Sequence, residues 1–156
     1  CMEQEFCDKE NLYLSGHSMG GLVASLIAPE LNPKGLILWA PALNMYHGAG
    51  IRARTMKGPT EKGWDINGLE LSREYLEEIR KMDTYNMARG YSGPVLLVHG
   101  TEDELVQVDI AWQYQDIYGT QMEMKLIDGA NHQYSSLRWK QQVYDASIDF
   151  IRRLIG

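Results

Sequence analysis

The chain has 156 residues, of which 44% are hydrophobic and 23% are charged. This composition is typical of one soluble globular domain with a sizeable core. Acidic residues outnumber basic residues by 21 to 15, which gives a net charge of −6. Because binding to nucleic acid needs a basic face, we expect no nucleic-acid partner. No apolar run approaches the roughly 20 residues of a membrane-spanning helix, so no membrane span is expected.

Two cysteines, Cys1 and Cys7, lie near the start of the chain. They match no zinc-binding spacing and are too few for a disulfide framework. We therefore interpret both as ordinary residues and expect neither a metal ion nor another cofactor.

The sequence enters an apolar strand soon after Cys1, so we interpret it as a piece of a longer protein whose upstream part could carry a leader.

Short apolar strands alternate with amphipathic helices along the chain, which predicts an α/β fold with a mostly parallel sheet. The first strand is expected over Asn11–Ser15. A helix follows over about Gly21–Ala28 and is expected to end near Pro29. The run Gly35–Ala40 is continuously apolar, as expected for a central strand that is covered on both faces.

The apolar pattern is lost from Asn44 to about Gly68, a stretch with five glycines that we interpret as irregular. A helix is then expected over Ser72–Met82, with Ser72 as its N-cap. A segment of roughly 45 residues between two core strands is far longer than an ordinary connection. We therefore interpret Asn44–Arg89 as an inserted cap or lid within a single domain that spans residues 1–156.

The core pattern resumes with strands expected over Val95–His99 and Met122–Ile127. A helix between them is expected to end at Gly119. Its apolar face is formed by Ile110, Ala111, Tyr114, Ile117 and Tyr118. A last helix is expected to bury a stripe at helical spacing, formed by Tyr144, Ile148, Ile151 and Ile155.

The run Gly16-His17-Ser18-Met19-Gly20-Gly21 joins the first strand to the first helix. A serine hydroxyl is a poor nucleophile and has to be presented to a base on a tight turn, for which Gly16 and Gly20 would leave room. The helix that follows would aim its first amides, including that of Met19, at the oxyanion formed during acyl transfer. The pattern therefore predicts Ser18 as a catalytic nucleophile.

A nucleophile of this kind needs an acid and then a histidine, each in a loop after a later strand. Asp103 follows the strand that starts at Val95, and His132 follows the strand over Met122–Ile127. His132 would take the proton from Ser18, and Asp103 would fix the tautomer of His132. Three nearby carboxylates remain alternatives for the acid: Glu102, Asp109 and Asp128.

The other histidines are weaker candidates. His17 is expected to point away from the nucleophile beside it, but we keep it as a candidate substrate contact. His99 is expected to pack at the end of a strand, and His47 lies in the predicted lid. Tyr46 and Trp64 are further candidate substrate contacts. They belong to a set of lid residues that would either line an apolar pocket or pack the lid onto the body: Met45, Tyr46, Met56, Trp64, Leu69, Tyr75 and Leu76.

Together the three motifs around Ser18, Asp103 and His132 resemble the α/β-hydrolase superfamily over almost the whole chain. They look closest to small bacterial cinnamoyl/feruloyl-esterase-like carboxylesterases, and the monoacylglycerol lipase and lysophospholipase branch is similar. The resemblance implies a serine hydrolase with a lid at the position of Asn44–Arg89. Such enzymes have further strands before the nucleophile and a His-Gly loop with a second oxyanion donor. The sequence lacks both, so it resembles the C-terminal part of that domain.

The leading functional hypothesis is a hydrolase that cleaves small-molecule carboxylic esters, such as hydroxycinnamate esters, through an acyl-enzyme on Ser18. The alternatives are a monoacylglycerol lipase or lysophospholipase, a prolyl-oligopeptidase-like peptidase, and a non-catalytic binding module. If the first strand forms a sheet edge, its unpaired backbone groups would favour self-association or a covering partner.

Overall fold

The computed structural model describes residues 8–43, 56–59, 63–66, 69–72, 74–75, 78 and 81–156. The chain divides into two compact units. The first combines Cys1–Leu43 with Tyr85–Gly156, and the second is Asn44–Thr84. Cys1, Cys7, Met45, Tyr46, His47 and Leu76 lie outside the described residues. The predictions made for these six residues therefore stay predictions.

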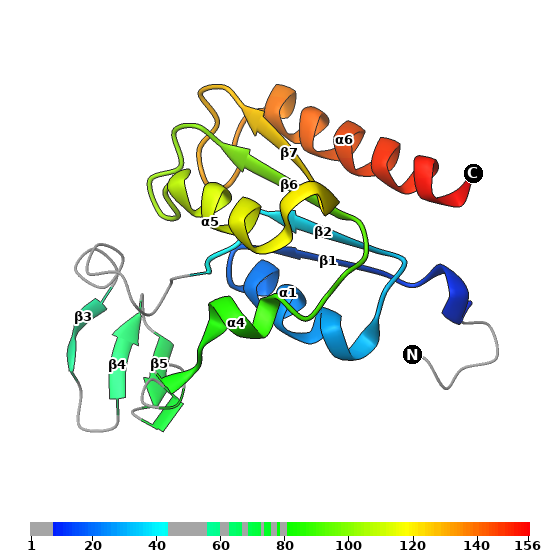
Figure 1. The fold of residues 1–156 in the computed structure, drawn as a ribbon. Coiled ribbons are helices and arrows are strands. Elements are labelled where there is room, and N and C mark those ends of the chain that lie inside the picture. Colours follow the sequence, from blue (N-terminus) through cyan, green and yellow to red (C-terminus); the bar gives the residue numbers. More distant parts are fainter. Residues whose placement is uncertain are drawn as a thin grey trace. The chain divides into compact units, whose positions relative to one another are not determined.

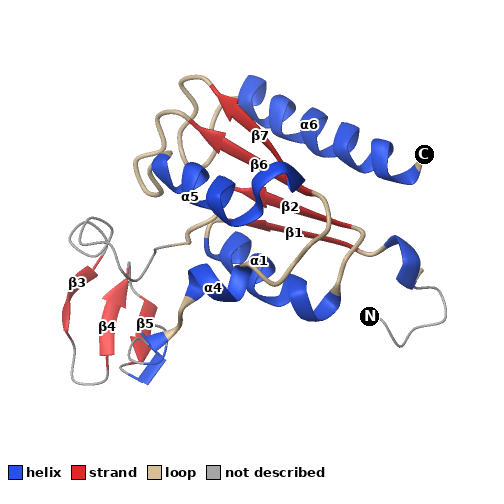
Figure 2. Cartoon of the chain, viewed as in Figure 1, coloured by secondary structure: helices blue, strands red, loops and turns tan. Residues whose placement is uncertain are grey.

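The first unit is built on a four-stranded parallel sheet with the strand order β1-β2-β6-β7 (Figure 2). The strands are β1 (Tyr13–His17), β2 (Gly35–Trp39), β6 (Val95–Gly100) and β7 (Met122–Ile127). Because all four run in the same direction, their carboxyl ends lie along one edge of the sheet. The predicted α/β class with a parallel sheet is confirmed.

Helices cover both faces of this sheet. Helix α6 (Leu137–Ile155) lies on one face, and α1 (Met19–Leu31) and α5 (Asp109–Tyr118) lie on the other (Figure 1). The remaining helical elements are short: η1 (Lys9–Asn11), α4 (Thr84–Ala88) and η2 (Gly119–Gln121). Gly119 ends α5 with a positive φ of 58°, as predicted from the sequence.

The core of the unit lies between the two central strands and the helices. Every residue of β6 is buried, and β2 is buried except for the partly exposed Trp39. On the α6 side, Ile37, Leu96 and Val98 pack with Phe150 in one apolar cluster. Burying each such side chain contributes about 1.5–3 kcal/mol. This layer holds the carboxyl edge of the sheet in place.

Two element boundaries near the N-terminus differ from the sequence prediction. Strand β1 begins at Tyr13 because Asp8 first caps a short turn, in which its carboxylate accepts a hydrogen bond from the Glu10 amide at 3.0 Å. Helix α1 continues through Pro29 to Leu31 and ends where Asn32 adopts a left-handed φ of 44°. Pro29 has no N–H and so removes one helical hydrogen bond, but the helix continues for two residues beyond it.

The predicted buried stripe of the last helix is wrong for three of its four residues, whereas Ile151 is partly buried against the core. Tyr144, Ile148 and Ile155 are 48%, 46% and 61% exposed. The face of α6 that meets the sheet instead contains the buried residues Val143, Ser147 and Phe150, with Ala146, Ile151 and Leu154 partly buried beside it. Two apolar stripes lie next to each other on this helix, and periodicity alone does not select between them.

The second unit contains a three-stranded antiparallel sheet of β3 (Met56–Pro59), β4 (Gly63–Ile66) and β5 (Leu69–Ser72). The prediction of irregular structure from Asn44 to about Gly68 is therefore wrong for β3 and β4. These two strands contain Gly58 and Gly63, and glycine is a residue type that strands disfavour, so the sequence does not resemble a strand there. The expected helix after Ser72 is supported by its hydroxyl, which accepts a hydrogen bond from the Tyr75 amide at 3.1 Å. Four described residues there are helical, namely Glu74, Tyr75, Glu78 and Lys81. A lid function for this unit stays a prediction.

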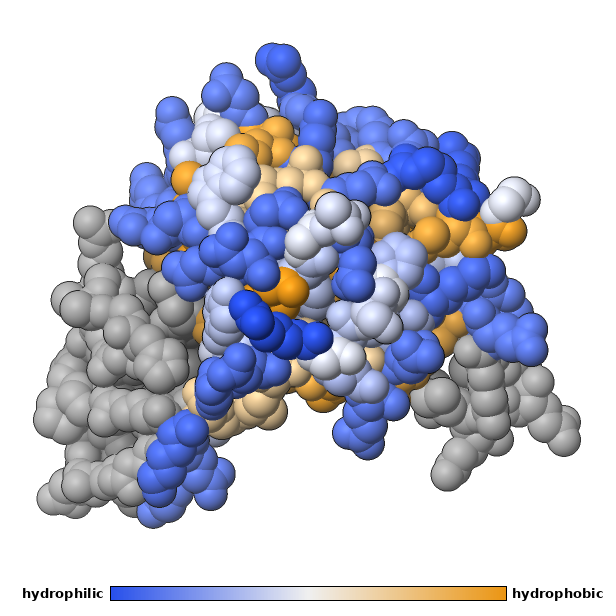
Figure 3. All heavy atoms as spheres, in the orientation of Figure 1, coloured by the Kyte–Doolittle hydropathy of each residue, from blue (hydrophilic) through white to orange (hydrophobic). Residues whose placement is uncertain are grey.

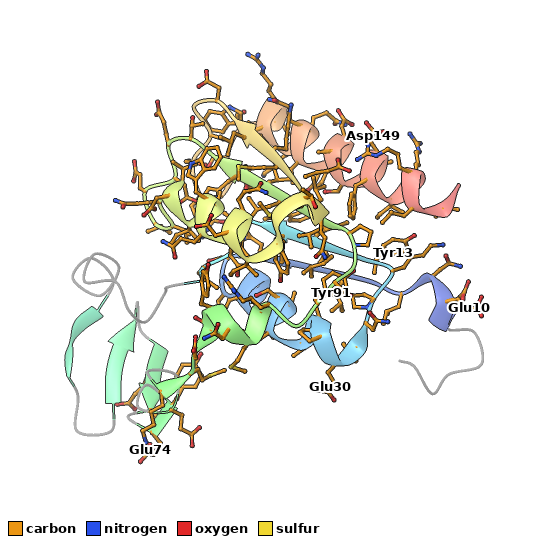
Figure 4. The ribbon with its side chains drawn as sticks, viewed as in Figure 1. Glu10, Tyr13, Glu30, Glu74, Tyr91 and Asp149 are labelled. Carbon is orange, nitrogen blue, oxygen red and sulfur yellow. The ribbon has the colours of Figure 1, made fainter. Side chains whose placement is uncertain are left out.

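Tyr91 fixes the loop that leads into β6 (Figure 4). Its buried hydroxyl donates to the carbonyl oxygen of Pro33 at 2.9 Å, and burial raises the pKa of Tyr91 to about 12.

The face shown in Figure 3 is largely hydrophilic, with apolar patches between the charged side chains. None of the helices in the described ranges is long and apolar enough to cross a membrane.

Candidate functional site

Three loops at the carboxyl edge of the sheet bring the predicted residues into one region. Ser18 follows β1 directly, Asp103 follows β6, and His132 follows β7. Ligands of open parallel sheets bind outside the carboxyl ends of the strands. The order along the chain and the position after each strand are those that the sequence predicts.

The backbone of Ser18 is strained and firmly held. Its φ of 55° and ψ of −121° lie outside the regions that residues with side chains favour. Its amide donates to the carbonyl oxygen of Trp39 at 2.9 Å. Its own carbonyl oxygen accepts from the amides of Leu22 and Ala42, both at 3.1 Å. These bonds keep the serine on a sharp turn between β1 and α1, where its side chain is presented at the sheet edge.

The tight turn constrains two glycines, but not the pair predicted. A Cβ atom on Gly16 would lie 2.2 Å from the carbonyl oxygen of Gly20, so only glycine fits there. A Cβ atom on Gly20 would meet no atom of the described residues within 4 Å. The second close approach is at Gly21, whose Cβ would lie 2.9 Å from that of Pro41. The expectation that Gly20 is needed to leave room is therefore wrong among the described residues.

Asp103 is buried and accepts hydrogen bonds on both carboxylate oxygens. Oδ1 accepts from the amides of Leu105 at 2.9 Å and Val106 at 2.8 Å, and Oδ2 lies 2.7 Å from Nδ1 of His132. Burial by itself raises the pKa of Asp103, but the hydrogen bonds from His132, His99 and Val106 outweigh it and hold the pKa well below its usual range. The carboxylate is therefore ionised at neutral pH.

The three alternative acids do not share this environment. Glu102, Asp109 and Asp128 are all exposed. Hydrogen bonds between the described residues join none of them to His132, whereas Asp103 bonds it directly. Among the described residues, Asp103 is therefore the one of the four carboxylates that forms a hydrogen bond with His132.

His132 is buried and its tautomer is set by Asp103. A carboxylate only accepts hydrogen bonds, so Nδ1 of His132 carries the proton and Nε2 is left as an acceptor. A base for a serine hydroxyl needs this tautomer. Among the described residues no hydrogen bond joins Nε2 to the hydroxyl of Ser18. Such bonds are often long in a free enzyme and shorten when substrate binds.

Hydrogen bonds join the loop that contains Asp103 to the loop that contains His132. The Glu102 amide donates to the carbonyl oxygen of Ala130 at 3.1 Å, and the Gly129 amide donates to the hydroxyl of Thr101 at 2.8 Å. A Cβ atom on Gly100 would lie 2.2 Å from the Ala130 carbonyl oxygen, so this approach requires glycine. The backbone contacts therefore set the spacing of Asp103 and His132 independently of their side chains.

Sequence reasoning placed His99 at a strand end but missed its contact with the acid. His99 is fully buried, and its Nε2 donates to the carbonyl oxygen of Val106 at 2.8 Å while lying 3.4 Å from Oδ2 of Asp103. Its Nδ1 is buried without a hydrogen-bond partner among the described residues, which agrees with a proton on Nε2. The spacing His99-Gly-x-x-Asp103 was the available signal.

His17, the last residue of β1, contacts His132. Its Nε2 lies 2.9 Å from the carbonyl oxygen of His132, and the two rings are 4.8 Å apart between centroids. Partial burial lowers the pKa of His17, although the bond to the His132 carbonyl opposes this effect. The structure does not bear on the predicted substrate contacts of His17, or of Trp64, whose side chain lies outside the described residues.

Two further features surround the predicted residues. Met19 is the first residue of α1 and is 45% exposed, so its amide lies at a helix N-terminus, where the helix field favours negative charge. A hollow of about 150 Å³ lies beside His17 and is lined in part by Trp39, Tyr134 and Tyr144. No group of three or more histidine, cysteine or acidic side chains that could hold a metal ion occurs among the described residues.

Comparison with known proteins places the chain in a family. The family model described as the prolyl oligopeptidase family matches residues 1–156. The chain belongs to the prolyl oligopeptidase family. It is therefore an α/β-hydrolase, as the three motifs predicted. No curated protein sequence matches this member of the prolyl oligopeptidase family.

Solved structures show the same fold. Est1E from Butyrivibrio proteoclasticus is 24% identical with a TM-score of 0.79, over 99% of this chain and 64% of that one. The esterase domain from a Rhodothermus marinus protein is 22% identical with a TM-score of 0.75, over 93% and 62%. Paleococcus ferrophilus monoacylglycerol lipase is 20% identical with a TM-score of 0.62, over 91% and 68%. The chain thus spans about two thirds of these proteins.

Proposed function

We propose that this member of the prolyl oligopeptidase family is a serine hydrolase that cleaves carboxylic esters. Ser18 is the nucleophile, His132 the general base and Asp103 the residue that orients the base. The observation that carries the proposal is the 2.7 Å bond between the buried side chains of Asp103 and His132. It lies at the same sheet edge as the strained turn of Ser18.

The reaction follows from this geometry. Nε2 of His132 takes the proton from Ser18 as the serine oxygen attacks the ester carbonyl carbon. The amide of Met19, at the start of α1, donates a hydrogen bond to the resulting oxyanion. The intermediate then breaks its bond to the alcohol, which leaves with the proton from His132. Water then attacks the acyl-enzyme as His132 takes a proton from it. The second tetrahedral intermediate breaks its bond to the serine oxygen and releases the acid, and His132 returns the proton to Ser18.

The substrate class proposed is an ester with a small or aromatic acyl group, such as a hydroxycinnamate. The resemblance of the three motifs to cinnamoyl/feruloyl esterases supports this class, and one solved structure of the similar protein Est1E has ferulic acid bound. The match to the prolyl oligopeptidase family supports a second candidate, a peptidase that uses the same three residues. A monoacylglycerol substrate is the third candidate, because one structural neighbour is a monoacylglycerol lipase.

A substrate panel separates these candidates. The protein at its natural length would be assayed with methyl ferulate, a monoacylglycerol and a chromogenic dipeptide, each against Ser18→Ala as the blank. The highest kcat/KM is expected for methyl ferulate, with no turnover of any substrate by Ser18→Ala. Cleavage of the dipeptide alone would overturn the ester assignment and favour the peptidase. Turnover that survives in Ser18→Ala would overturn the assignment of Ser18 as the nucleophile.

A further inference from the structure

His17 forms a hydrogen bond between the nucleophile's strand and the base. Its Nε2 lies 2.9 Å from the carbonyl oxygen of His132, although the two residues are 115 positions apart. A carbonyl oxygen only accepts, so Nε2 of His17 must carry a proton and donate it. Because His17 is the residue directly before Ser18, this bond ties the backbone of the base to the neighbour of the nucleophile.

The other hydrogen bonds around His132 do not reach β1. The side chain of His132 bonds Asp103, and the backbone on its N-terminal side bonds Thr101 and Glu102. All of these join the base to the acid loop after β6. Among the described residues, the His17 bond is the hydrogen bond that joins the loop of His132 to β1. Without it, Asp103 and His132 would keep their spacing, but the loop of His132 would lose its direct hydrogen bond to the strand that precedes Ser18.

The ring of His17 is itself held in place. It lies against the His132 ring at 4.8 Å and against the Tyr134 ring at 6.0 Å between centroids. Tyr134 is fixed in turn, because its hydroxyl donates to the carbonyl oxygen of Val98 at 3.0 Å. His17 therefore has a defined orientation, and its Nε2–H is directed at one acceptor.

We propose that His17 is a positioning residue that sets the distance between Ser18 and Nε2 of His132 by holding the His132 carbonyl. This role rests on the proposed function of Ser18 and His132. In this role His17 acts through the backbone of His132, whose carbonyl oxygen it holds at 2.9 Å. A displacement of about 1 Å between catalytic groups can lower the rate about 100-fold, so one lost hydrogen bond at this point is expected to be visible in kcat.

The test compares three variants of the protein at its natural length. His17→Phe keeps an aromatic ring but removes the donor, whereas the terminal amide of His17→Gln reaches toward the position of Nε2. His17→Asn carries the same amide on a shorter side chain that falls short of it. The expected result is a kcat about 10- to 100-fold lower for His17→Phe and His17→Asn, and close to wild type for His17→Gln. The KM for the ester is expected to stay unchanged in all three.

A second readout separates positioning from general damage. The low-field proton resonance of Nδ1–H in His132, which reports its bond to Asp103, is expected to persist in His17→Phe. If His17→Phe does not fold, the comparison of His17→Gln with His17→Asn decides. Equal kcat values for wild type and the variants would overturn the positioning role alone, and so would a raised KM with unchanged kcat. A wild-type protein that neither turns over ester nor reacts with a fluorophosphonate would overturn the proposed function and this role together.

Discussion

Nδ1 of His132 lies 2.7 Å from Oδ2 of Asp103, inside the protein and across 29 positions of sequence. The carboxylate accepts a hydrogen bond from Nδ1–H of the imidazole, which leaves Nε2 as an acceptor, as the proposed base requires. Two backbone amides hold the other carboxylate oxygen, so the acid has a single orientation.

Replacing the acid should remove most of the activity while leaving the fold intact. Asp103→Asn keeps the size of the side chain but can place an N–H toward His132, which would favour the wrong tautomer. We expect kcat to fall about 10⁴-fold, measured with an ester substrate. Asp128→Asn removes an exposed carboxylate from the neighbouring loop and is the matched control, with kcat expected near wild type. Equal losses in the two variants would contradict the assignment of the acid.

The stability of the protein should depend on pH through Asp103. Its pKa is depressed in the folded state, so the unfolded chain binds the proton more readily. The stabilising contribution is therefore fully present above about pH 4, the ordinary pKa of the side chain, and is lost as pH falls toward the folded value. Urea unfolding between neutral and acidic pH should show a smaller loss of unfolding free energy for Asp103→Asn than for wild type. If the unfolding free energies of wild type and Asp103→Asn fell in parallel with pH, Asp103 would not be the source of the pH dependence.

Removing the donor of His99 should affect both stability and rate. His99→Leu leaves the carbonyl oxygen of Val106 without its 2.8 Å hydrogen bond in a buried position. An unpaired buried acceptor costs about 1–3 kcal/mol, so a lower Tm is expected. The kcat should also fall, because Asp103 loses the neighbour at 3.4 Å that helps to hold it. His99→Gln restores a donor and should recover part of both. A His99→Leu variant with wild-type Tm and kcat would show that His99 only fills space.

The two glycines of the Gly-x-Ser-x-Gly pattern should respond differently to alanine. Gly16→Ala places a Cβ atom 2.2 Å from a backbone oxygen and is expected to destabilise the protein by about 3 kcal/mol or more. The added Cβ atom of Gly20→Ala meets no atom of the described residues within 4 Å, and alanine favours the helix by up to about 1 kcal/mol. The unfolding free energy of Gly20→Ala should therefore equal or exceed that of wild type. Equal destabilisation by both substitutions would contradict the turn geometry.

Much of the fold could be predicted because the apolar pattern is simple where strands are buried on both faces. The continuous apolar run from Gly35 gave the right strand, and the motifs around Ser18, Asp103 and His132 lie after their strands as expected. The buried face of α6 was missed because Tyr144 and Val143 begin two apolar stripes side by side. Which stripe meets the sheet depends on how the helix packs, and local spacing does not contain that information.

The contacts of His17 and His99 were beyond sequence reasoning for a similar reason. The bond from His17 joins residues 115 positions apart, and its acceptor is a backbone carbonyl that any residue could supply. The residue type at the acceptor position therefore does not indicate in the sequence that this hydrogen bond forms. His99 was closer to being found, because it precedes Asp103 by four residues. Its orientation toward the carboxylate depends on how the loop after β6 turns.

The proposed reaction depends on Ser18 as a nucleophile that His132 activates. The most direct measurement treats the protein at its natural length with a fluorophosphonate probe and locates the modified residue by mass spectrometry. We predict a single label on Ser18, lost in both Ser18→Ala and His132→Ala. A protein that takes up no label, or that carries it on another serine, would contradict the claim.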